Sequence, residues 1–270
     1  MPPSARVFTL SEAINKIRLG VVQILIMAYA SNKEEMDILK GRSFISHILG
    51  SGFFVSDKAH IITAKHVIVD GQEILAKIPV NNKKLCIGIG LPNSERFTGN
   101  IVLEDFNLID EHPVYDLSLL QMKKNPFVAE VYSGIVIMNN PVPVPALHLK
   151  LNPKRPIEGQ RIGISGYPLQ ERVLITNSGH IASVWNTPYY LADIEVNPGN
   201  SGGPVYLVDD AGVIGVCVSF KPSPLLNKDG KPLVINGKQA YASSGLTNII
   251  PSKYVIDLIE RNGISYLVHA

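Results

Sequence analysis

The sequence has little cysteine, little charge and no long apolar run. Only two of its 270 residues are cysteines, Cys86 and Cys217, so its stability must come from a packed core. Both lie in apolar, strand-like stretches, which favours buried reduced thiols over a disulfide. No histidine or second cysteine stands at ligand spacing beside either one. We therefore expect no metal site and no organic cofactor.

The charge and the apolar runs exclude further classes of protein. A formal charge of +2, with no basic block, argues against nucleic acid as a partner. The longest apolar run, 21–30, is interrupted by Gln23 and has about half the length that a membrane helix needs, so we expect no membrane span. Residues 1–10 do not resemble a secretory signal. These absences predict a cytoplasmic location.

What the sequence does contain is a large apolar fraction arranged in short runs. Apolar residues make up 46% and charged residues 18%, which predicts an ordered core. Gly, Pro and Asn interrupt the runs every few residues, and this spacing predicts an all-β barrel or sandwich. Asp229-Gly230 and Asn236-Gly237 predict hairpin turns. The expected strands are 21–27, 52–55, 60–63, 117–122, 161–165, 179–184, 205–208 and 213–220.

Two helices and one connector complete the expected organisation. One helix is expected over 11–18 with Ser11 as its N-cap, and another begins at Pro251 and stops at Asn262-Gly263. Three prolines in 139–145 exclude a central strand there. The resulting units are an N-terminal helical segment (1–20), a first β unit (21–138), a connector (139–150), a second β unit (151–250) and a C-terminal helix and tail (251–270).

Three segments carry residues suited to nucleophilic catalysis. His66 follows a buried strand, Asp116 precedes an apolar strand, and Ser201 lies in the turn Gly-Asn-Ser-Gly-Gly-Pro. A serine hydroxyl needs a base within hydrogen-bond reach, and the base needs a partner that fixes its tautomer. Each residue alone has a structural explanation, as a loop, cap or turn residue. The specific turn around Ser201 gives weight to the other two.

The glycines around Ser201 serve a separate need. A tetrahedral oxyanion requires two backbone N–H groups aimed at one point, which a turn without β-carbons provides. We expect this oxyanion hole over Gly199, Asn200 and Ser201, with the N–H groups of Gly199 and Ser201 as the natural pair.

In the order His, Asp, Ser, these motifs resemble a chymotrypsin-like (trypsin-like) serine protease, and within that clan the protease domain of HtrA/Deg enzymes. The resemblance covers nearly the whole chain. It implies two six-stranded antiparallel β-barrels with a short N-terminal helix and a C-terminal helix, and a serine endopeptidase acting on protein or peptide substrates. It also allows a homo-oligomer. The matching segments are 13–17, 21–24, 50–55, 63–67, 116–120, 159–168, 177–181, 197–204 and 244–252.

The sequence departs from the family at two places. It stops after the closing helix, so we expect a protease domain without a PDZ domain. Asn200 stands where trypsin-type zymogens carry Asp, so activation by cutting the N-terminus is not expected. By the family's geometry, Glu195 lies near the base of the substrate pocket, where it would favour a basic side chain, or it points outward, because a slip of one residue in register reverses its face. Val218 and Ser219 lie on the strand that pairs with substrate.

Two alternatives stay open at this point. The turn around Ser201 also fits the nucleophile elbow of α/β-hydrolases, but that fold needs a helix after the serine, and residues 204–208 predict a strand. The second alternative is a catalytically silent pseudoprotease that acts as a protein-binding scaffold on the same fold.

Overall fold

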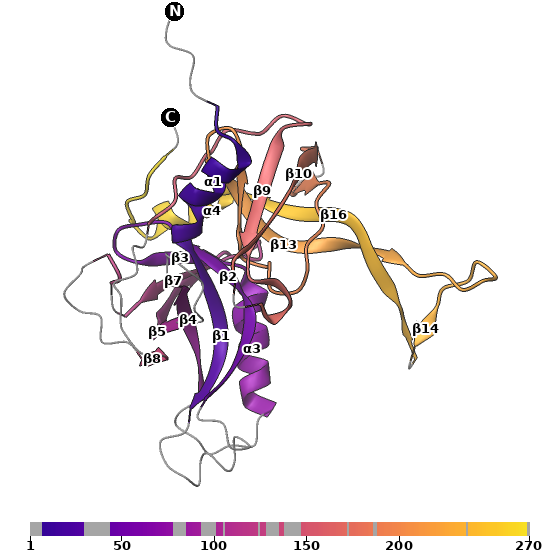
Figure 1. Cartoon of the computed structure of the whole chain (residues 1–270), viewed down its shortest axis with the longest axis horizontal. Helices are drawn as coiled ribbons and strands as arrows, with labels where there is room; N and C mark the ends of the chain where they lie inside the picture. The colour runs from indigo at the N-terminus through magenta and orange to yellow at the C-terminus, as the bar shows by residue number, and fades with distance from the viewer. Residues whose placement is uncertain are drawn as a thin grey trace, which may run out of the picture.

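The fold was analysed in a computed structural model of the chain (Figure 1). Two β units follow one another along the sequence, with helix α1 before the first unit and helix α4 after the second. The described residues are 7–29, 44–77, 85–92, 101–104, 106–123, 125–127, 135–137, 147–171, 173–185, 188–235 and 237–268.

The first unit is an antiparallel sheet with the strand order β6-β7-β3-β2-β1-β4-β5-β8 among the described residues. β5 ends at Glu104 and β6 begins at Phe106, so one nearly continuous run pairs with β4 at one end of the sheet and with β7 at the other. If β5 and β6 are counted as one run, six strands form a barrel-like unit, and β8 is added to β5. The bounds are β1 (Val21–Tyr29), β2 (Phe44–Phe54), β3 (His60–Thr63), β4 (Leu85–Pro92), β5 (Ile101–Glu104), β6 (Phe106–Glu111), β7 (Ser118–Met122) and β8 (Ile135–Ile137).

The second unit is a closed barrel with the strand order β10-β11-β16-β13-β12-β9. Its interior is one apolar cluster that includes Ile162, Ile164, Val205 and Ile249. Two six-stranded units with a helix at each end are therefore confirmed. The bounds are β9 (Arg161–Gly166), β10 (Ile175–Ser183), β11 (Tyr190–Ala192), β12 (Pro204–Leu207), β13 (Val213–Pro224) and β16 (Tyr241–Pro251).

The two expected helices are present with shifted starts. Helix α1 (Leu10–Ile17) is capped by Thr9 instead of Ser11, because Thr9 and Glu12 form a reciprocal capping box. A short 3-10 turn, η1 (Arg18–Gly20), leads from it into β1. Helix α4 (Ser252–Arg261) begins one residue after Pro251, which is its N-cap. It ends before Gly263, whose φ of 65° suits the stop signal.

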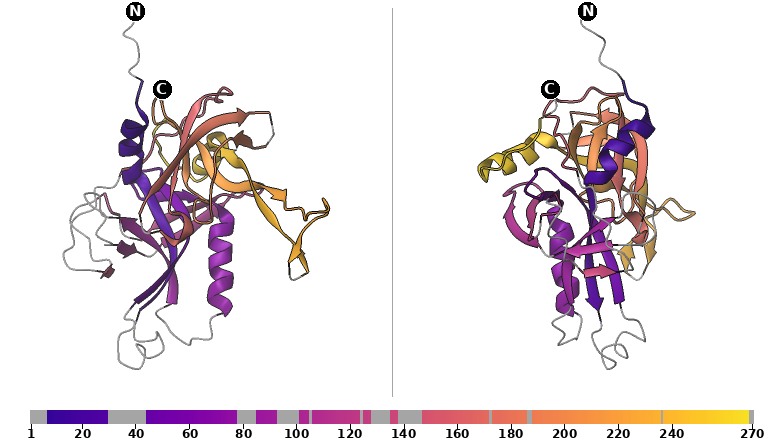
Figure 2. Two further views of the ribbon diagram at one scale, coloured as in Figure 1. Left: turned by 45° about the vertical axis from the view of Figure 1, so that its right-hand side comes forward. Right: turned by 60° about the vertical axis from the view of Figure 1, so that its left-hand side comes forward.

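A third helix, α3 (Lys65–Lys77), was not expected from the sequence, and it carries His66. It buries Val67, Ile68 and Gly71 and packs against β1, β2 and β4 (Figures 1 and 2). This apolar set recurs at helical spacing, so a weak pattern was available in the sequence. The strand before it and the polar residues between its apolar positions obscured that pattern.

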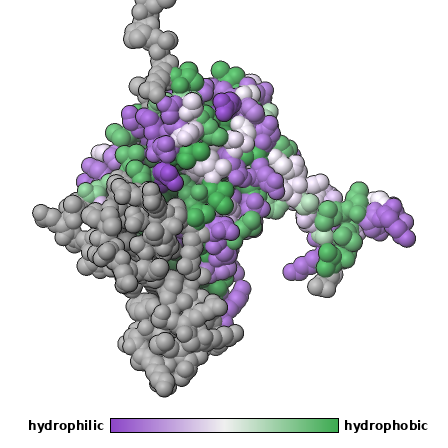
Figure 3. All heavy atoms as spheres, viewed as in Figure 1, coloured by the Kyte–Doolittle hydropathy of each residue, from purple (hydrophilic) through white to green (hydrophobic). Residues whose placement is uncertain are grey.

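The long strands β13 and β16 continue beyond the barrel as a two-stranded arm, residues 219–247. The pairing of β12 with β13 ends at Val216, while β13 and β16 stay paired as far as Pro224 and Tyr241. The arm projects from the body in every view and carries the small pair β14 (Val234–Ile235) and β15 (Lys238–Gln239) (Figures 1 and 2). Apolar atoms gather along it (Figure 3). Its exposed large apolar residues are Phe220, Leu225, Leu226, Val234, Ile235 and Tyr241.

The predicted hairpin turns and connector are described in part. Residues 227–231 form a turn in which the Gly230 N–H donates to the Asn227 carbonyl. Gly237, with a φ of 77°, lies between β14 and β15, and Asn236 is outside the described residues. Of the expected connector, 139–146 also lies outside them. Leu149 is described, and its N–H donates to the Phe54 carbonyl. The domain boundaries stay a prediction.

Cys217 is buried and its thiol is free. Burial raises the pKa of this thiol to about 12, so it is an unreactive apolar neighbour at neutral pH. The side chain of Cys86 is outside the described part of the chain. Within the part that is described, no helix has the length and apolar character required to cross a membrane.

Candidate active site

His66 and Asp116 are held together by two hydrogen bonds. Asp116 Oδ1 accepts from the backbone N–H of His66 at 2.8 Å, and Asp116 Oδ2 lies 2.6 Å from His66 Nδ1. The first bond fixes the start of α3 against the carboxylate, and the second fixes the imidazole ring. Because the carboxylate accepts the Nδ1 proton, a neutral His66 presents Nε2 as a free acceptor.

The environment of this pair shifts both of its pKa values. Burial lowers the pKa of His66, but the hydrogen bond and charge of Asp116, with a contribution from Asp70, outweigh it and hold the pKa above the ordinary 6.5. Burial raises the pKa of Asp116, but bonds from the His66 ring and from the backbone of His66 and Lys65 hold it below the ordinary 3.8. The pair therefore favours an imidazolium beside a carboxylate.

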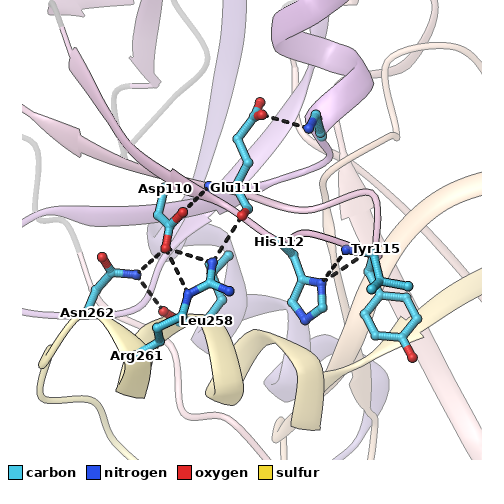
Figure 4. Close-up of polar contacts among 9 residues, drawn as sticks. Asp110, Glu111, His112, Tyr115, Leu258, Arg261 and Asn262 are labelled. Atoms are coloured by element: carbon cyan, nitrogen blue, oxygen red, sulfur yellow. Dashed lines mark hydrogen bonds and ion pairs between the residues drawn. The ribbon is translucent and has the colours of Figure 1, made fainter.

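The chain that leads to Asp116 is anchored to the C-terminal helix (Figure 4). Asp110 Oδ2 accepts from Arg261 Nε at 3.0 Å and from Arg261 Nη2 at 2.7 Å, and Asn262 Nδ2 donates to the same oxygen at 2.8 Å. The next residue, Glu111, forms a 2.7 Å ion pair with Lys65, the neighbour of His66. These bonds connect α4, β6 and the start of α3 around the His66–Asp116 pair.

The turn that carries Ser201 has its backbone carbonyls fixed by hydrogen bonds. The Pro198 carbonyl accepts from the Leu169 N–H at 2.8 Å, and the Asn200 carbonyl accepts from the Gly203 N–H at 2.9 Å. In a trans peptide the N–H points opposite to its carbonyl, so the N–H groups of Gly199 and Ser201 point away from these two donors. Neither N–H has an acceptor among the described residues.

Only glycine fits at position 199 in this backbone conformation. Its φ is +102°, and a β-carbon built on it would lie 2.2 Å from the Tyr167 carbonyl oxygen. Asn200 differs from what was expected, because its N–H donates to the Asn197 carbonyl at 3.0 Å and is not available to an oxyanion. Its Oδ1 accepts from the Asn197 N–H at 3.0 Å, so Asn200 shapes the turn. The expectation that Asn200 contributes to the hole is therefore wrong.

Ser51, on β2, joins the Ser201 turn to the first unit. Its Oγ donates to the Gly199 carbonyl at 2.6 Å and accepts from the Tyr167 N–H at 3.0 Å. Its backbone N–H donates to the Ser201 carbonyl at 2.8 Å. The carbonyl of Ser51 accepts from Thr63 Oγ1 at 2.7 Å, and Thr63 ends the strand that leads to His66. In the sequence, Ser51 stands only as part of the matching segment 50–55, and no local motif indicates this role.

The Ser201 hydroxyl donates to the Val218 carbonyl at 3.2 Å. No hydrogen bond joins Ser201 to His66 in the described structure. Catalytic hydrogen bonds are often unformed without substrate, so this geometry does not exclude their pairing. A β-carbon on Gly202 would lie 2.1 Å from the Ser51 carbonyl oxygen and 2.9 Å from Ala64 N, which shows that the turn packs against the segment just before His66.

A cavity of about 310 Å³ opens beside Ser201. Val218 and Ser219 line it, as does Cys217. Glu195 does not line it, because its side chain is exposed, while the neighbouring Val196 is buried and does line the cavity. The Glu195 side chain therefore points outward from this cavity, which is one of its two expected orientations. The complete lining is Val196, Asn197, Pro198, Ser201, Cys217, Val218, Ser219, Phe220 and Pro222.

Two further features bear on the chemistry. Among the described residues, no group of three or more His, Cys, Asp or Glu side chains is placed to hold a metal ion. The segment after Ser201 is strand β12, where the α/β-hydrolase alternative required a helix. The elbow interpretation is therefore wrong.

Comparison with known proteins identifies the family. The model of the trypsin-like peptidase domain matches residues 50–216, which is more than half of the chain. A "Probable periplasmic serine endoprotease DegP-like" of Pseudomonas fulva is 23% identical over 176 residues, covering 65% of this chain and 30% of the relative. A second protein of that name, from Marinomonas, is 23% identical over 218 residues, covering 79% and 35%. An uncharacterized protein, y4bJ, of Sinorhizobium fredii is 28% identical over 180 residues, covering 63% and 22%.

Solved structures show the same fold. The HtrA-type protease AlgW with a decapeptide superposes with a TM-score of 0.56 at 17% identity, covering 93% of this chain and 66% of that one. The serine endoprotease from Yersinia pestis gives a TM-score of 0.52 at 16% identity, covering 94% and 66%. The expected chymotrypsin-like fold is thereby confirmed.

The curated relatives bear on the expected location of the protein and on how much of their length this chain covers. Two of them are named as periplasmic, which contradicts the cytoplasmic location expected from residues 1–10. That expectation rested on the character of residues 1–10 and on the lack of an apolar run long enough for a membrane helix, and neither feature determines a compartment. This chain spans about a third or less of the length of the curated relatives it matches. With the match over residues 50–216, the chain belongs to the trypsin-like peptidase domain family and is similar to its HtrA-type proteases.

Proposed function

We propose that this chain is a serine endopeptidase in which Ser201 is the nucleophile, His66 the general base and Asp116 the residue that orients His66. The observation that carries the proposal is the Ser201 turn. Its carbonyls are bonded to other backbone groups or to Ser51, while the N–H groups of Gly199 and Ser201 have no acceptor among the described residues. Such a pair of donors, held in place before substrate arrives, is what acyl transfer requires.

The proposed reaction transfers an acyl group from a peptide nitrogen to water. Ser201 Oγ rotates away from Val218, gives its proton to His66 Nε2 and attacks the substrate carbonyl carbon. The tetrahedral intermediate collapses as the C–N bond breaks, and His66 returns the proton to the leaving amine. Water then loses a proton to His66 and attacks the acyl-enzyme. The bond from the acyl carbon to Ser201 Oγ breaks and His66 returns the proton to Oγ, which releases the acid and restores Ser201.

Asp116 has two tasks in this scheme. Its bond to Nδ1 keeps Nε2 free as the acceptor, and its charge stabilises the imidazolium formed after proton transfer. The N–H groups of Gly199 and Ser201 stabilise the oxyanion. The loss of one such donor typically lowers kcat by a factor of about 100 to 1,000.

We propose protein or peptide chains as substrates, with an apolar side chain on the acyl side of the scissile bond. The cavity beside Ser201 is lined mainly by apolar groups, among them Val196, Val218 and Phe220. The related AlgW structure holds a decapeptide, which supports peptides as ligands. The names of two curated relatives support a periplasmic location.

A catalytically silent scaffold is the second candidate, favoured by the bond from the Ser201 hydroxyl to the Val218 carbonyl instead of to His66. A fluorophosphonate probe separates the two candidates. We expect the probe to label Ser201 in the wild type and to leave S201A unlabelled. S201A should also lose roughly a millionfold in kcat while keeping its fold by circular dichroism. If the folded wild type is not labelled, the enzyme proposal fails and the scaffold stands.

A further inference from the structure

The side chain of Gln170 bonds to both backbone groups of Ile48. Gln170 Nε2 donates to the Ile48 carbonyl at 2.7 Å, and Gln170 Oε1 accepts from the Ile48 N–H at 2.7 Å. Strand β3 pairs with β2 only from Gly52 to Phe54, so Ile48 lies on β2 outside that pairing. The amide thus bonds to the backbone of β2 as a neighbouring strand would. It connects the second unit to the first at a point 122 residues away in sequence.

Gln170 belongs to a strained turn. The 3-10 turn η2 (Pro168–Gln170) contains two consecutive non-glycine residues with positive φ, Leu169 at 55° and Gln170 at 65°. Each such residue is strained, because its β-carbon lies close to the following carbonyl oxygen in this conformation. Strain of this kind persists only where the surrounding contacts hold it in place. The two bonds to Ile48 are contacts of that kind.

The same turn sets the direction of one oxyanion donor. Leu169, next to Gln170, donates its N–H to the Pro198 carbonyl at 2.8 Å. That bond fixes the Pro198–Gly199 peptide, and a trans peptide then points the Gly199 N–H away from Leu169. If η2 relaxed from this conformation, the 168–169 peptide would reorient and the Leu169 N–H would leave Pro198. The Pro198 carbonyl would then be free to rotate, and the rotation would remove the Gly199 N–H from the hole.

We propose that Gln170 is a positioning residue for the oxyanion hole. It acts through Leu169 and Pro198 and does not touch substrate. This inference rests on the proposed function, because it gives the Gly199 N–H a catalytic task. The two bonds between Gln170 and Ile48 join β2 of the first unit to η2 in the second, and Leu169 of η2 bonds to the turn that bears Ser201. The competence of the hole therefore depends on how the two units are held together.

Kinetics of Q170A and Q170E test the proposal, with Q160A as the matched control. Gln160 also accepts a backbone N–H through Oε1, from Ile157 at 2.8 Å, but that bond lies in a different loop. We expect Q170A to lower kcat by a factor of roughly 10 to 100 with KM within about twofold, because the loss falls on an oxyanion donor. Q170E should lose at least as much, because its carboxylate cannot donate to the Ile48 carbonyl. Q160A should keep the wild-type kcat.

A second measurement is the affinity for a peptide boronate, which would stay unchanged if Gln170 had only a structural role. The boronate forms a tetrahedral adduct with Ser201, so its affinity should fall in Q170A by the same factor as kcat, while the affinity for a cleaved peptide product stays unchanged. A wild-type kcat in Q170A would overturn the proposal, and so would an equal loss in Q160A.

A crystal structure of Q170A tests the positioning role of Gln170 independently of the proposed function. We expect the Pro198 carbonyl to have left the Leu169 N–H. If that bond is retained, the positioning role is wrong, whatever the activity. If the wild type is not labelled by a fluorophosphonate, the proposed function fails, while the crystal structure still decides whether Gln170 orients the turn.

Discussion

Ser51 Oγ donates a 2.6 Å hydrogen bond to the carbonyl oxygen of Gly199, 148 residues away in the other β unit. Ser51 Oγ also accepts from the Tyr167 N–H, and the Ser51 backbone N–H donates to the Ser201 carbonyl. A single fully buried serine therefore bonds to both sides of the proposed oxyanion turn. We therefore expect small movements between the two units to change the position of Ser201 through its bond to Ser51.

Substitution of Ser51 by alanine should lower both stability and activity. It leaves the Gly199 carbonyl and the Tyr167 N–H without a partner in a buried place, which costs about 1–3 kcal/mol in the free energy of unfolding. The freed Gly199 carbonyl should also lower kcat by a factor of roughly 10 or more. S56A is the matched control, because Ser56 is also buried and bonds to His60 Nδ1 at 2.7 Å, in the loop that precedes β3. Urea unfolding should show losses in both variants, and a comparable loss of kcat in S56A would contradict this role for Ser51.

The sequence predicted the candidate residues that lie in recognisable local motifs. His66, Asp116 and Ser201 stand in short segments, and the turn around Ser201 is specific enough to indicate a two-barrel protease. Helix α3 was missed because tertiary contacts with β1, β2 and β4 bury its apolar face. The roles of Ser51 and Gln170 could not be found, because their hydrogen bonds join residues more than 100 positions apart.

Glu195 and Asn200 depend on backbone details that the sequence alone does not give. Glu195 is exposed between the buried Ile194 and Val196, so a shift of one residue separates the predicted pocket residue from the observed one. Side chains alternate between the two faces of an extended chain, and a prediction cannot fix that register without the fold. The N–H of Asn200 is bonded within its own turn, a detail of backbone conformation that residue types do not reveal.

The pH profile should report the raised pKa of His66. As a general base His66 must be neutral, so kcat/KM should rise with pH through a midpoint above 6.5. D116N removes the charge and the bond that raise this pKa, so its midpoint should move to lower pH while kcat falls by about 10,000-fold. The same raised pKa stabilises the folded state fully below pH 6.5, and that contribution disappears as the pH rises through the folded-state pKa. An unchanged midpoint in D116N would show that Asp116 does not control His66.

Alanine at Gly199 should abolish activity through the backbone. Its β-carbon would meet the Tyr167 carbonyl oxygen at 2.2 Å and Pro168 Cα at 2.9 Å, so the turn must move away from Leu169. Gly230 offers a matched control with a φ of +74° and no atom within 4 Å of a new β-carbon. G230A should cost only about 1–2 kcal/mol in the free energy of unfolding and leave kcat unchanged. Steady-state kinetics and thermal unfolding of both variants check the prediction, and a G199A enzyme with wild-type kcat would contradict it.

Cleavage should favour apolar side chains on the acyl side of the scissile bond, because no charged residue is among the described residues that line the cavity beside Ser201. Burial of an unpaired ammonium or guanidinium there costs several kcal/mol. Peptides with Val, Leu or Phe at that position should therefore have kcat/KM values at least about 100-fold above those with Lys or Arg. E195Q should leave this ratio unchanged, because Glu195 is exposed and outside the lining. Efficient cleavage after Lys that is lost in E195Q would show instead that this carboxylate reaches the cavity when substrate binds.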